Sequence, residues 1–219
     1  MIYAYGVCEP AAAASAPPCG GMGGARVRAL GGDGLTAIYS RHRSAPLRPT
    51  PRLVLAHERV LEHLMARGPV LPMRFGTWLE GEDALAAMLA ARRSELVQGL
   101  ERVRGRAELG VRLLAARAEA GTGDARASGR AYLLARAREH RRYEQAVADV
   151  HAPLAALSAA SRVWEPRPPA ILVGAYLLDC EHVALFRARA SDLAQRQPEL
   201  QLFVTGPWPP YSFASEEPR

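Results

Sequence analysis

Histidine and glutamate side chains in residues 56–65 are the first candidates for metal or acid–base chemistry. His57 and His63 are six residues apart in a segment with helical spacing, so their side chains point to different sides of a helix. The pair His57-Glu58 also lacks a second histidine four residues on, which the zinc-protease motif requires. We therefore expect no metal site in this segment.

A second candidate is the run Cys180-Glu181-His182, at the start of a predicted helix, where a cysteine or histidine could be reactive. The sequence places no partner histidine or aspartate to complete a triad. Cys8, Cys19 and Cys180 share no CxxC spacing, so neither disulfides nor zinc are indicated. We expect a reduced, cytosolic protein with no catalytic residue, metal or cofactor.

The glycine-rich segments and the basic residues bear on nucleotide and nucleic-acid binding. The glycines of residues 20–24 do not open a helix after a strand, and the glycines of residues 121–123 have no following lysine, so neither segment matches a phosphate-binding loop. The net charge is +6, from 28 basic and 22 acidic residues, and every basic residue is arginine. Only residues 135–144 concentrate positive charge. Nucleic-acid binding there would require a steep salt dependence, and a solvated helix face is the simpler interpretation.

The chain can bury a substantial core, since 49% of its 219 residues are hydrophobic. The first residues have no basic region ahead of an apolar run, and residues 11–16 form only a short apolar stretch before two prolines. We therefore expect neither a signal peptide nor a membrane span.

Residues 1–80 are predicted to form a first α+β domain. Residues 2–7 and the hairpin of residues 26–30 and 35–40 supply three strands, with glycines at the turn. A helix from about residue 53 to 67 ends at Gly68-Pro69, and a fourth strand covers residues 70–79. The result is a small sheet with one helix laid on it. Residues 9–24, rich in Ala, Pro and Gly, are predicted to form a flexible surface loop.

Residues 81–108 are predicted to be a connecting helix, and residues 109–219 a second domain. In that domain a strand at 109–116 and a loop at 120–128 precede a long helix from Gly129, in which Pro153 should cause a kink or restart. A buried strand at 170–179, a helix and a strand at 200–205 follow. The pattern predicts a ferredoxin-like variant one strand short, with parallel neighbours. The two long helices could pair as a coiled-coil-like hairpin.

The last residues carry three prolines and the aromatic side chains Trp208, Tyr211 and Phe213. One interpretation is that these rings fold back over a sheet and seal the edge of a core. The other is that they form a rigid aromatic surface for a protein partner.

Five stretches, in the same order along nearly the whole chain, resemble the GvpL/GvpF family of gas vesicle proteins. They are YAYGV (3–7), AHE (56–58), GPVLPMRFGT (68–77), GRAYL (129–133) and TGPWPPYSF (205–213). The insert after Val7 and the absence of lysine depart from the family pattern. The resemblance implies a two-domain α+β fold with a ferredoxin-like C-terminal half, in a non-enzymatic accessory or minor shell component of cytoplasmic gas vesicles.

The first functional hypothesis is therefore an assembly protein that binds the major shell protein and other gas vesicle accessory proteins, without nucleic acid or membrane. Its expected interface consists of Arg74, Trp78, Trp208, Tyr211 and Phe213. The alternative is an enzyme or small-ligand binder that uses a cleft between the two domains. Its polar lining would be His57, Arg74 and His182.

Overall fold

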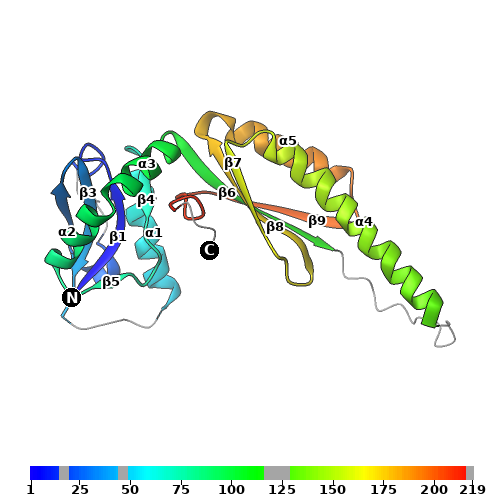
Figure 1. Ribbon diagram of the computed structural model, residues 1–219, viewed down its shortest axis with the longest axis horizontal. Coiled ribbons are helices and arrows are strands. Elements are labelled where there is room, and N and C mark those ends of the chain that lie inside the picture. The colour runs from blue at the N-terminus through cyan, green and yellow to red at the C-terminus, as the bar shows by residue number, and fades with distance from the viewer. Residues whose placement is uncertain (15–19, 44–48, 116–128, 216–219) are drawn as a thin grey trace. The chain divides into compact units, whose positions relative to one another are not determined.

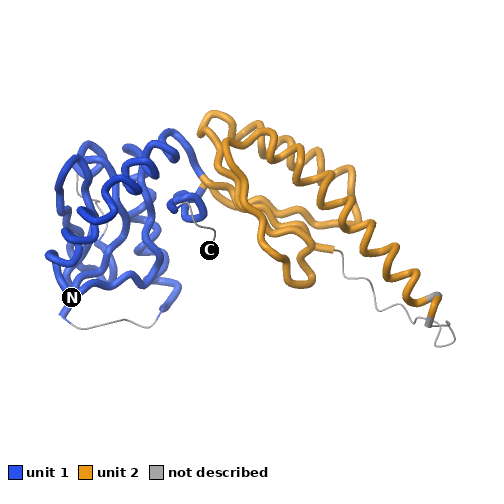
Figure 2. Tube along the Cα trace, in the orientation of Figure 1, with its two compact units in different colours: residues 1–107, 208–219 blue, residues 108–207 orange. Residues whose placement is uncertain are grey.

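A computed structural model of the chain describes residues 1–14, 20–43, 49–115 and 129–215. The chain folds into two compact units, shown in Figure 1 and Figure 2. Unit 1 comprises Met1–Ala107 and Trp208–Arg219, and unit 2 comprises Glu108–Pro207. The sequence-based boundary kept residues 109–219 together. The structure differs at the end of the chain, because the aromatic tail packs against unit 1.

Unit 1 is built on an antiparallel sheet in which β1 is central, between β3 and β4. The strand order is β2-β3-β1-β4, and β5 also pairs with β1. The strands are β1 (Ile2–Cys8), β2 (Val27–Gly32), β3 (Leu35–Arg41), β4 (Val70–Pro72) and β5 (Trp78–Leu79). All seven residues of β1 are buried, as expected of a central strand covered on both faces.

The hairpin between β2 and β3 confirms the prediction from its glycine-rich turn. Gly32 pairs with Leu35, so the loop itself is only Asp33-Gly34. Both loop residues have positive φ, 50° at Asp33 and 82° at Gly34, which is the geometry that an Asp-Gly turn supplies.

Helices cover both faces of the unit 1 sheet, whereas the sequence predicted one helix on one face. α1 (Pro51–Met65) begins at Thr50, whose side-chain oxygen accepts a hydrogen bond from the Leu53 amide, with Pro51 in the first turn. It packs on the face that includes Val70. α2 (Glu82–Ala91) and α3 (Arg93–Val103) follow, and a Cβ at Gly99 of α3 would lie 2.9 Å from Leu71, on the opposite face. The expected connecting helix is thus two helices that complete unit 1.

The predicted strand over residues 70–79 is interrupted by a turn. The Arg74 carbonyl oxygen accepts hydrogen bonds from the Thr77 amide and hydroxyl, at 3.1 and 2.8 Å. Gly76 takes a φ of 91°, which favours glycine. The turn separates β4 from β5 and presents residues 73–77 at the edge of the sheet.

The predicted surface loop over residues 9–24 contributes to the core at its described ends, residues 9–14 and 20–24; residues 15–19 lie outside the described part. A short 3-10 helix, η1 (Met22–Gly24), buries Met22 to 1% exposure, and Ala12 is equally buried. The Met22 amide donates to the hydroxyl of Tyr5 at 2.7 Å. Ala12 and Met22 are therefore buried in the core, while residues such as Pro10 and Gly23 remain exposed.

Unit 2 has the element order β-α-β-β-α-β and the strand order β7-β8-β6-β9, which is the ferredoxin-like split βαβ arrangement. Its strands are β6 (Arg106–Ala115), β7 (Ala160–Trp164), β8 (Ala170–Asp179) and β9 (Leu200–Trp208). Its helices are α4 (Gly129–Ala155), the short η2 (Cys180–His182) and α5 (Val183–Gln195). The loop expected over residues 120–128 lies outside the described residues.

Two predictions for this unit were wrong. One is the omission of β7, a short edge strand with no buried residue, which pairs antiparallel with β8. Parallel neighbours are also absent from the described sheet, because β8 lies between β6 and β7, and β6 lies between β8 and β9. Each crossover helix therefore joins strands that are not adjacent, and the sheet is antiparallel (Figure 1).

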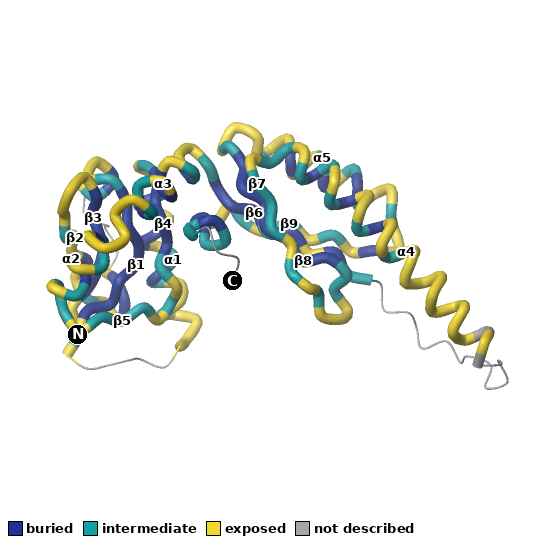
Figure 3. Tube along the Cα trace, viewed as in Figure 1, coloured by how far each residue is buried: buried dark blue, intermediate teal, exposed yellow. Residues whose placement is uncertain are grey.

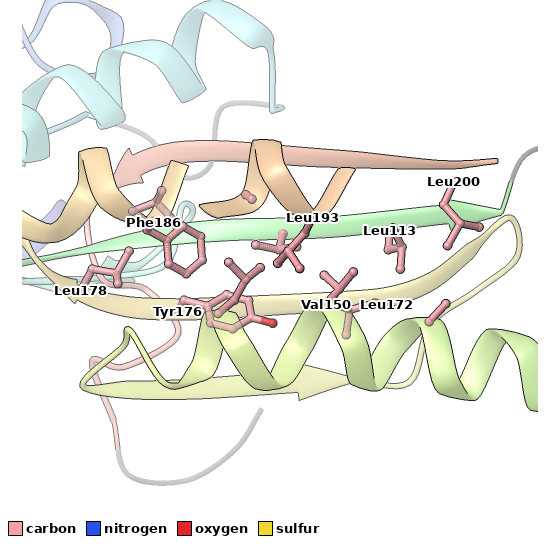
Figure 4. Close-up of a cluster of buried hydrophobic side chains, with 13 residues drawn as sticks. Leu113, Val150, Leu172, Tyr176, Leu178, Phe186, Leu193 and Leu200 are labelled. Atoms are coloured by element: carbon pink, nitrogen blue, oxygen red, sulfur yellow. The ribbon is translucent and has the colours of Figure 1, made fainter. Parts of the chain in front are cut away.

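The core of unit 2 lies between one face of its sheet and the helices α4 and α5 (Figure 4). Alternate residues Leu109, Val111 and Leu113 of β6 point into it. Val150 and Leu154 of α4 are buried in this core, so they are not available for a coiled-coil seam. The predicted hairpin with the helix of residues 83–106 is thus wrong, since each helix packs within its own unit. α4 also continues through Pro153.

Candidate interaction site

His57 lies in the core of unit 1, with no solvent exposure. Its Nδ1 is 2.9 Å from the hydroxyl of Tyr3, and its ring is stacked 5.6 Å from that of Tyr5. Burial lowers the pKa of His57 to about 4, with only a partial offset from the nearby Met73 backbone. The imidazole is therefore neutral at physiological pH and acts as a polar core residue. It cannot line an open cleft, which removes one member of the alternative ligand-binding set.

The aromatic tail covers the outside of this cluster. The hydroxyl of Tyr211 donates to Glu58 Oε1 at 2.5 Å, and the Tyr211 ring stacks on His57 with centroids 6.4 Å apart. Phe213 is 2% exposed, and its carbonyl oxygen accepts a hydrogen bond from Arg102 of α3. Burial raises the pKa of Glu58, although the Tyr211 hydroxyl partly offsets this effect. Tyr211 and Phe213 thus close the core of unit 1.

Trp78 and Trp208, the other aromatic residues of the expected interface, differ in exposure. Trp78 is half-buried in β5, and its ring lies 5.1 Å from those of Tyr3 and His42, in edge-on contacts. Trp208 is 41% exposed at the end of β9. The structure therefore brings Trp78 and Tyr211 into one aromatic cluster and leaves Trp208 with an open ring surface.

A groove of about 200 Å³ opens on the other side of β4, and Arg74 stands at its rim. We call it the Arg74 groove; its lining residues are Val7, Leu71, Pro72, Met73, Arg74, Thr77, Leu79, Met88, Arg92, Leu96, Ala214 and Ser215. Pro72 has no amide hydrogen to offer at this sheet edge. The turn at residues 74–77 holds the Arg74 backbone in place.

The two arginines of the Arg74 groove differ in whether a carboxylate pairs with them. Arg92 binds Glu95 through two hydrogen bonds of 2.8 and 2.5 Å, which raise its pKa. Arg74 is exposed and forms no ion pair with any residue of the described ranges. An apolar groove with one uncompensated guanidinium at its rim can accept apolar side chains of another polypeptide together with a carboxylate.

The remaining chemical candidates belong to unit 2 and are not among the residues that line this groove. His182 is exposed in η2 of unit 2, 3.9 Å from Asp179 and 3.8 Å from Glu181. Burial and the adjacent Asp179 raise the pKa of Cys180, the opposite of what a reactive thiolate requires. Within the described residues, no cluster of three or more histidine, cysteine, aspartate or glutamate side chains is arranged to hold a metal. No described helix is both long and apolar enough to cross a bilayer.

Sequence reasoning found Arg74 but missed the residues that surround it. Met88 and Leu96 fall within the segment predicted to be a connecting helix, and Val7 within the first predicted strand. A usable signal was the run at residues 70–73, which is apolar at every position and therefore needs cover on both faces of the sheet.

Comparison with known proteins gives consistent results. The family model described as "Gas vesicle synthesis protein GvpL/GvpF" matches residues 1–215. Gas vesicle protein F2 of Halobacterium salinarum is 26% identical over 216 residues, covering 97% of this chain and 91% of that protein. Gas vesicle protein F of a Streptomyces species, strain CB03234, is 31% identical over 240 residues, covering 96% and 98%. Gas vesicle protein L of the same strain is 29% identical over 251 residues, covering 97% and 92%.

Two crystal structures share the fold. GvpF from Anabaena sp. PCC7120 superposes with a TM-score of 0.84 at 21% identity, covering 99% of this chain and 96% of that one. GvpF from Microcystis aeruginosa gives a TM-score of 0.77 at 18% identity, covering 98% of each chain. The family match over nearly all residues, with the motifs and fold above, shows that this chain belongs to the GvpL/GvpF family of gas vesicle synthesis proteins.

Proposed function

We propose that this protein is a non-enzymatic assembly factor of the cytoplasm that binds the major gas vesicle shell protein, and other accessory proteins, while vesicles nucleate and grow. The single observation that carries the proposal is the Arg74 groove. It joins an apolar lining to an arginine without an ion-pair partner among the described residues. Such a surface suits a hydrophobic, assembly-prone polypeptide that must be covered until it is incorporated.

The expected interface is narrower than the five residues that the sequence suggested. Tyr211 and Phe213 support it from within the unit 1 core, and Trp78 supports the sheet edge. Arg74 and the apolar groove residues make the contact, and Trp208 offers exposed aromatic surface. Aromatic and arginine side chains contribute most to binding when they sit beside apolar pockets.

Co-purification of the shell protein with the tagged full chain tests this proposal. The charge reversal Arg74→Glu should sharply reduce the amount of shell protein recovered, because a shell-protein carboxylate would then meet a like charge. Arg52→Glu is the matched control, since Arg52 is also an exposed arginine of unit 1 but lies on α1, away from the groove. The control should retain the shell protein.

Deletion of the gene, followed by electron microscopy of the cells, tests the role in assembly. Loss of vesicles, or only small immature ones, is expected. The proposal fails if deletion leaves normal vesicles and the purified chain does not bind the shell protein.

A further inference from the structure

The first half of α4 packs against no other described residues of its own unit. Between residues 130 and 142 every described side chain is exposed, whereas Ala146 and Val150 further along are buried (Figure 3). Tyr132, Leu133 and Leu134 are 60%, 67% and 49% exposed, so three large apolar side chains face solvent on different sides of the helix. Helices in proteins depend mainly on packing of one face for stability. This segment, the projecting half of α4, lacks that contribution.

The projecting half is also strongly basic. Residues 130–142 contain five arginines and one glutamate. Arg138 is three residues from Arg141 and four from Arg142, and like charges at these spacings repel on a helix. Arg142 pairs with Glu199, but Arg130, Arg136, Arg138 and Arg141 form no ion pair with the described residues. Negative charge brought to this surface would relieve the repulsion.

The face of α4 that carries Leu134, Arg138 and Arg141 continues into a groove of about 730 Å³ beside α5. Ala148 and Ala152 are small residues of its wall, and Arg189 of α5 and Arg196, which follows α5, also line it. Starting in the projecting half, one stripe on this face follows spacings of four and three residues, namely Leu134, Arg138, Arg141, Gln145, Ala148 and Ala152. The stripe therefore spans about 27 Å at 1.5 Å per residue.

We propose that this stripe and the α4–α5 groove dock an acidic amphipathic helix of a partner protein. A stripe with this period matches the side-chain spacing of a helix laid along it. The apolar residues of the partner would cover Leu134, Ala148 and Ala152, and its carboxylates would face Arg138 and Arg141. The inference deepens the proposed function and rests on it, since it takes a protein to be the partner.

Other occupants fit less well. A second copy of the chain would bring the same excess of positive charge against this surface, which is unfavourable. A nucleic acid has no apolar side chains to cover Leu134 beside the arginines, so it would satisfy only the charge of this surface. An acidic helix with an apolar stripe satisfies both the charge and the apolar surface.

The experiment measures binding of the full chain to a labelled synthetic helical peptide that carries leucine and glutamate at heptad positions. Fluorescence anisotropy of the peptide reports the binding. The double variant Arg138→Glu/Arg141→Glu should weaken binding by about tenfold or more, and should instead bind the same peptide with lysine in place of glutamate. Leu133→Ala/Leu134→Ala should also weaken binding. The control, Arg112→Glu/Arg167→Glu, removes two exposed arginines elsewhere in unit 2 and should bind as the wild type does.

Equal binding by all variants, or tighter binding of a single-stranded oligonucleotide than of the acidic peptide, would overturn the inference. So would self-association of the wild-type chain that the double leucine variant abolishes. Circular dichroism of each variant checks that the fold is retained. If the shell protein co-purifies and Arg74→Glu prevents it, but the acidic peptide does not bind, this inference fails and the proposed function stands.

Discussion

At the residue scale, the network of Tyr3, His57, Glu58 and Tyr211 explains why unit 1 retains ionisable groups in its core. The histidine ring fills space between aromatic rings, and the tyrosine hydroxyls satisfy one polar atom each of His57 and Glu58. His57 Nε2 and Glu58 Oε2 have no hydrogen-bond partner of standard geometry in the described structure. Buried polar atoms of this kind make unit 1 sensitive to the protonation of both residues.

The His57 pKa of about 4, against an ordinary value of 6.5, predicts a loss of stability in acid. The fold favours neutral imidazole, so the contribution of His57 is present above pH 6.5 and is lost as the pH falls toward 4. Glu58 acts in the opposite sense, because its raised pKa favours the fold when it takes up a proton. Urea unfolding should show the His57 effect as about 2 kcal/mol between about pH 7 and pH 5.

The matched variant for this measurement is His57→Phe, which keeps an aromatic ring and removes the titrating group. Its unfolding free energy should fall less than that of the wild type over the same pH interval. Parallel pH profiles for the two proteins would show that His57 does not carry the effect.

Tyr211→Phe should destabilise unit 1 by about 1–3 kcal/mol, because the buried carboxyl of Glu58 loses its donor. The pKa of Glu58 should also rise further in this variant, since the Tyr211 hydroxyl lowers that pKa in the wild-type protein. Denaturant unfolding measures the first effect. Tyr132→Phe is the control, because that hydroxyl belongs to an exposed side chain of α4. An unchanged unfolding free energy for Tyr211→Phe would contradict this role of the tail.

At the element scale, patterns that repeat along the sequence were predictable, and features set by neighbouring elements were not. The β2–β3 hairpin follows from its Asp-Gly turn, and β8 from a run of apolar residues. β7 was missed because an edge strand with Arg162 in it shows no buried alternation. The break between β4 and β5 depends on the turn at Gly76, and its positive φ was not predicted from the sequence.

A β-bulge in β1 is another feature that the sequence does not show. Ala4 pairs with Tyr39 and Gly6 with Ile38, so Tyr5 is an extra residue in this strand. The shift places Tyr3, Tyr5 and Cys8 in the same core cluster, and it turns Gly6 toward Leu61 of α1. Gly6 therefore permits the close approach of α1 to the sheet.

Gly6→Ala should destabilise the protein by about 1–3 kcal/mol through overpacking. Its Cβ would lie 2.8 Å from the Leu71 carbonyl oxygen and 3.0 Å from Leu61 Cδ2. Gly32→Ala is the comparison, because a Cβ there meets nothing within 4 Å. Thermal unfolding of both variants checks this expectation, and equal melting temperatures would contradict the packing of α1 on β1.

At the scale of the whole molecule, the sequence predicted two α+β units but assigned some segments to the wrong unit. Residues 81–108 were predicted to be a connecting helix because helical apolar spacing can be seen within the segment, whereas the sheet face that α2 and α3 cover cannot. The tail joins unit 1 through contacts as distant in sequence as that between Glu58 and Tyr211. Pairings of this kind depend on the tertiary fold and leave no local pattern. The candidate groove has the same origin, since its residues come from separate segments of unit 1.

The most direct test of the proposed function is site-specific photo-crosslinking in vesicle-forming cells. A photoreactive amino acid replaces Thr77 in the Arg74 groove or, as a control, the exposed Leu55 on α1. Binding through the groove predicts a covalent adduct with the major shell protein from position 77 and none from position 55, as identified by mass spectrometry. Absence of the adduct at position 77, or equal yields from both positions, would contradict it.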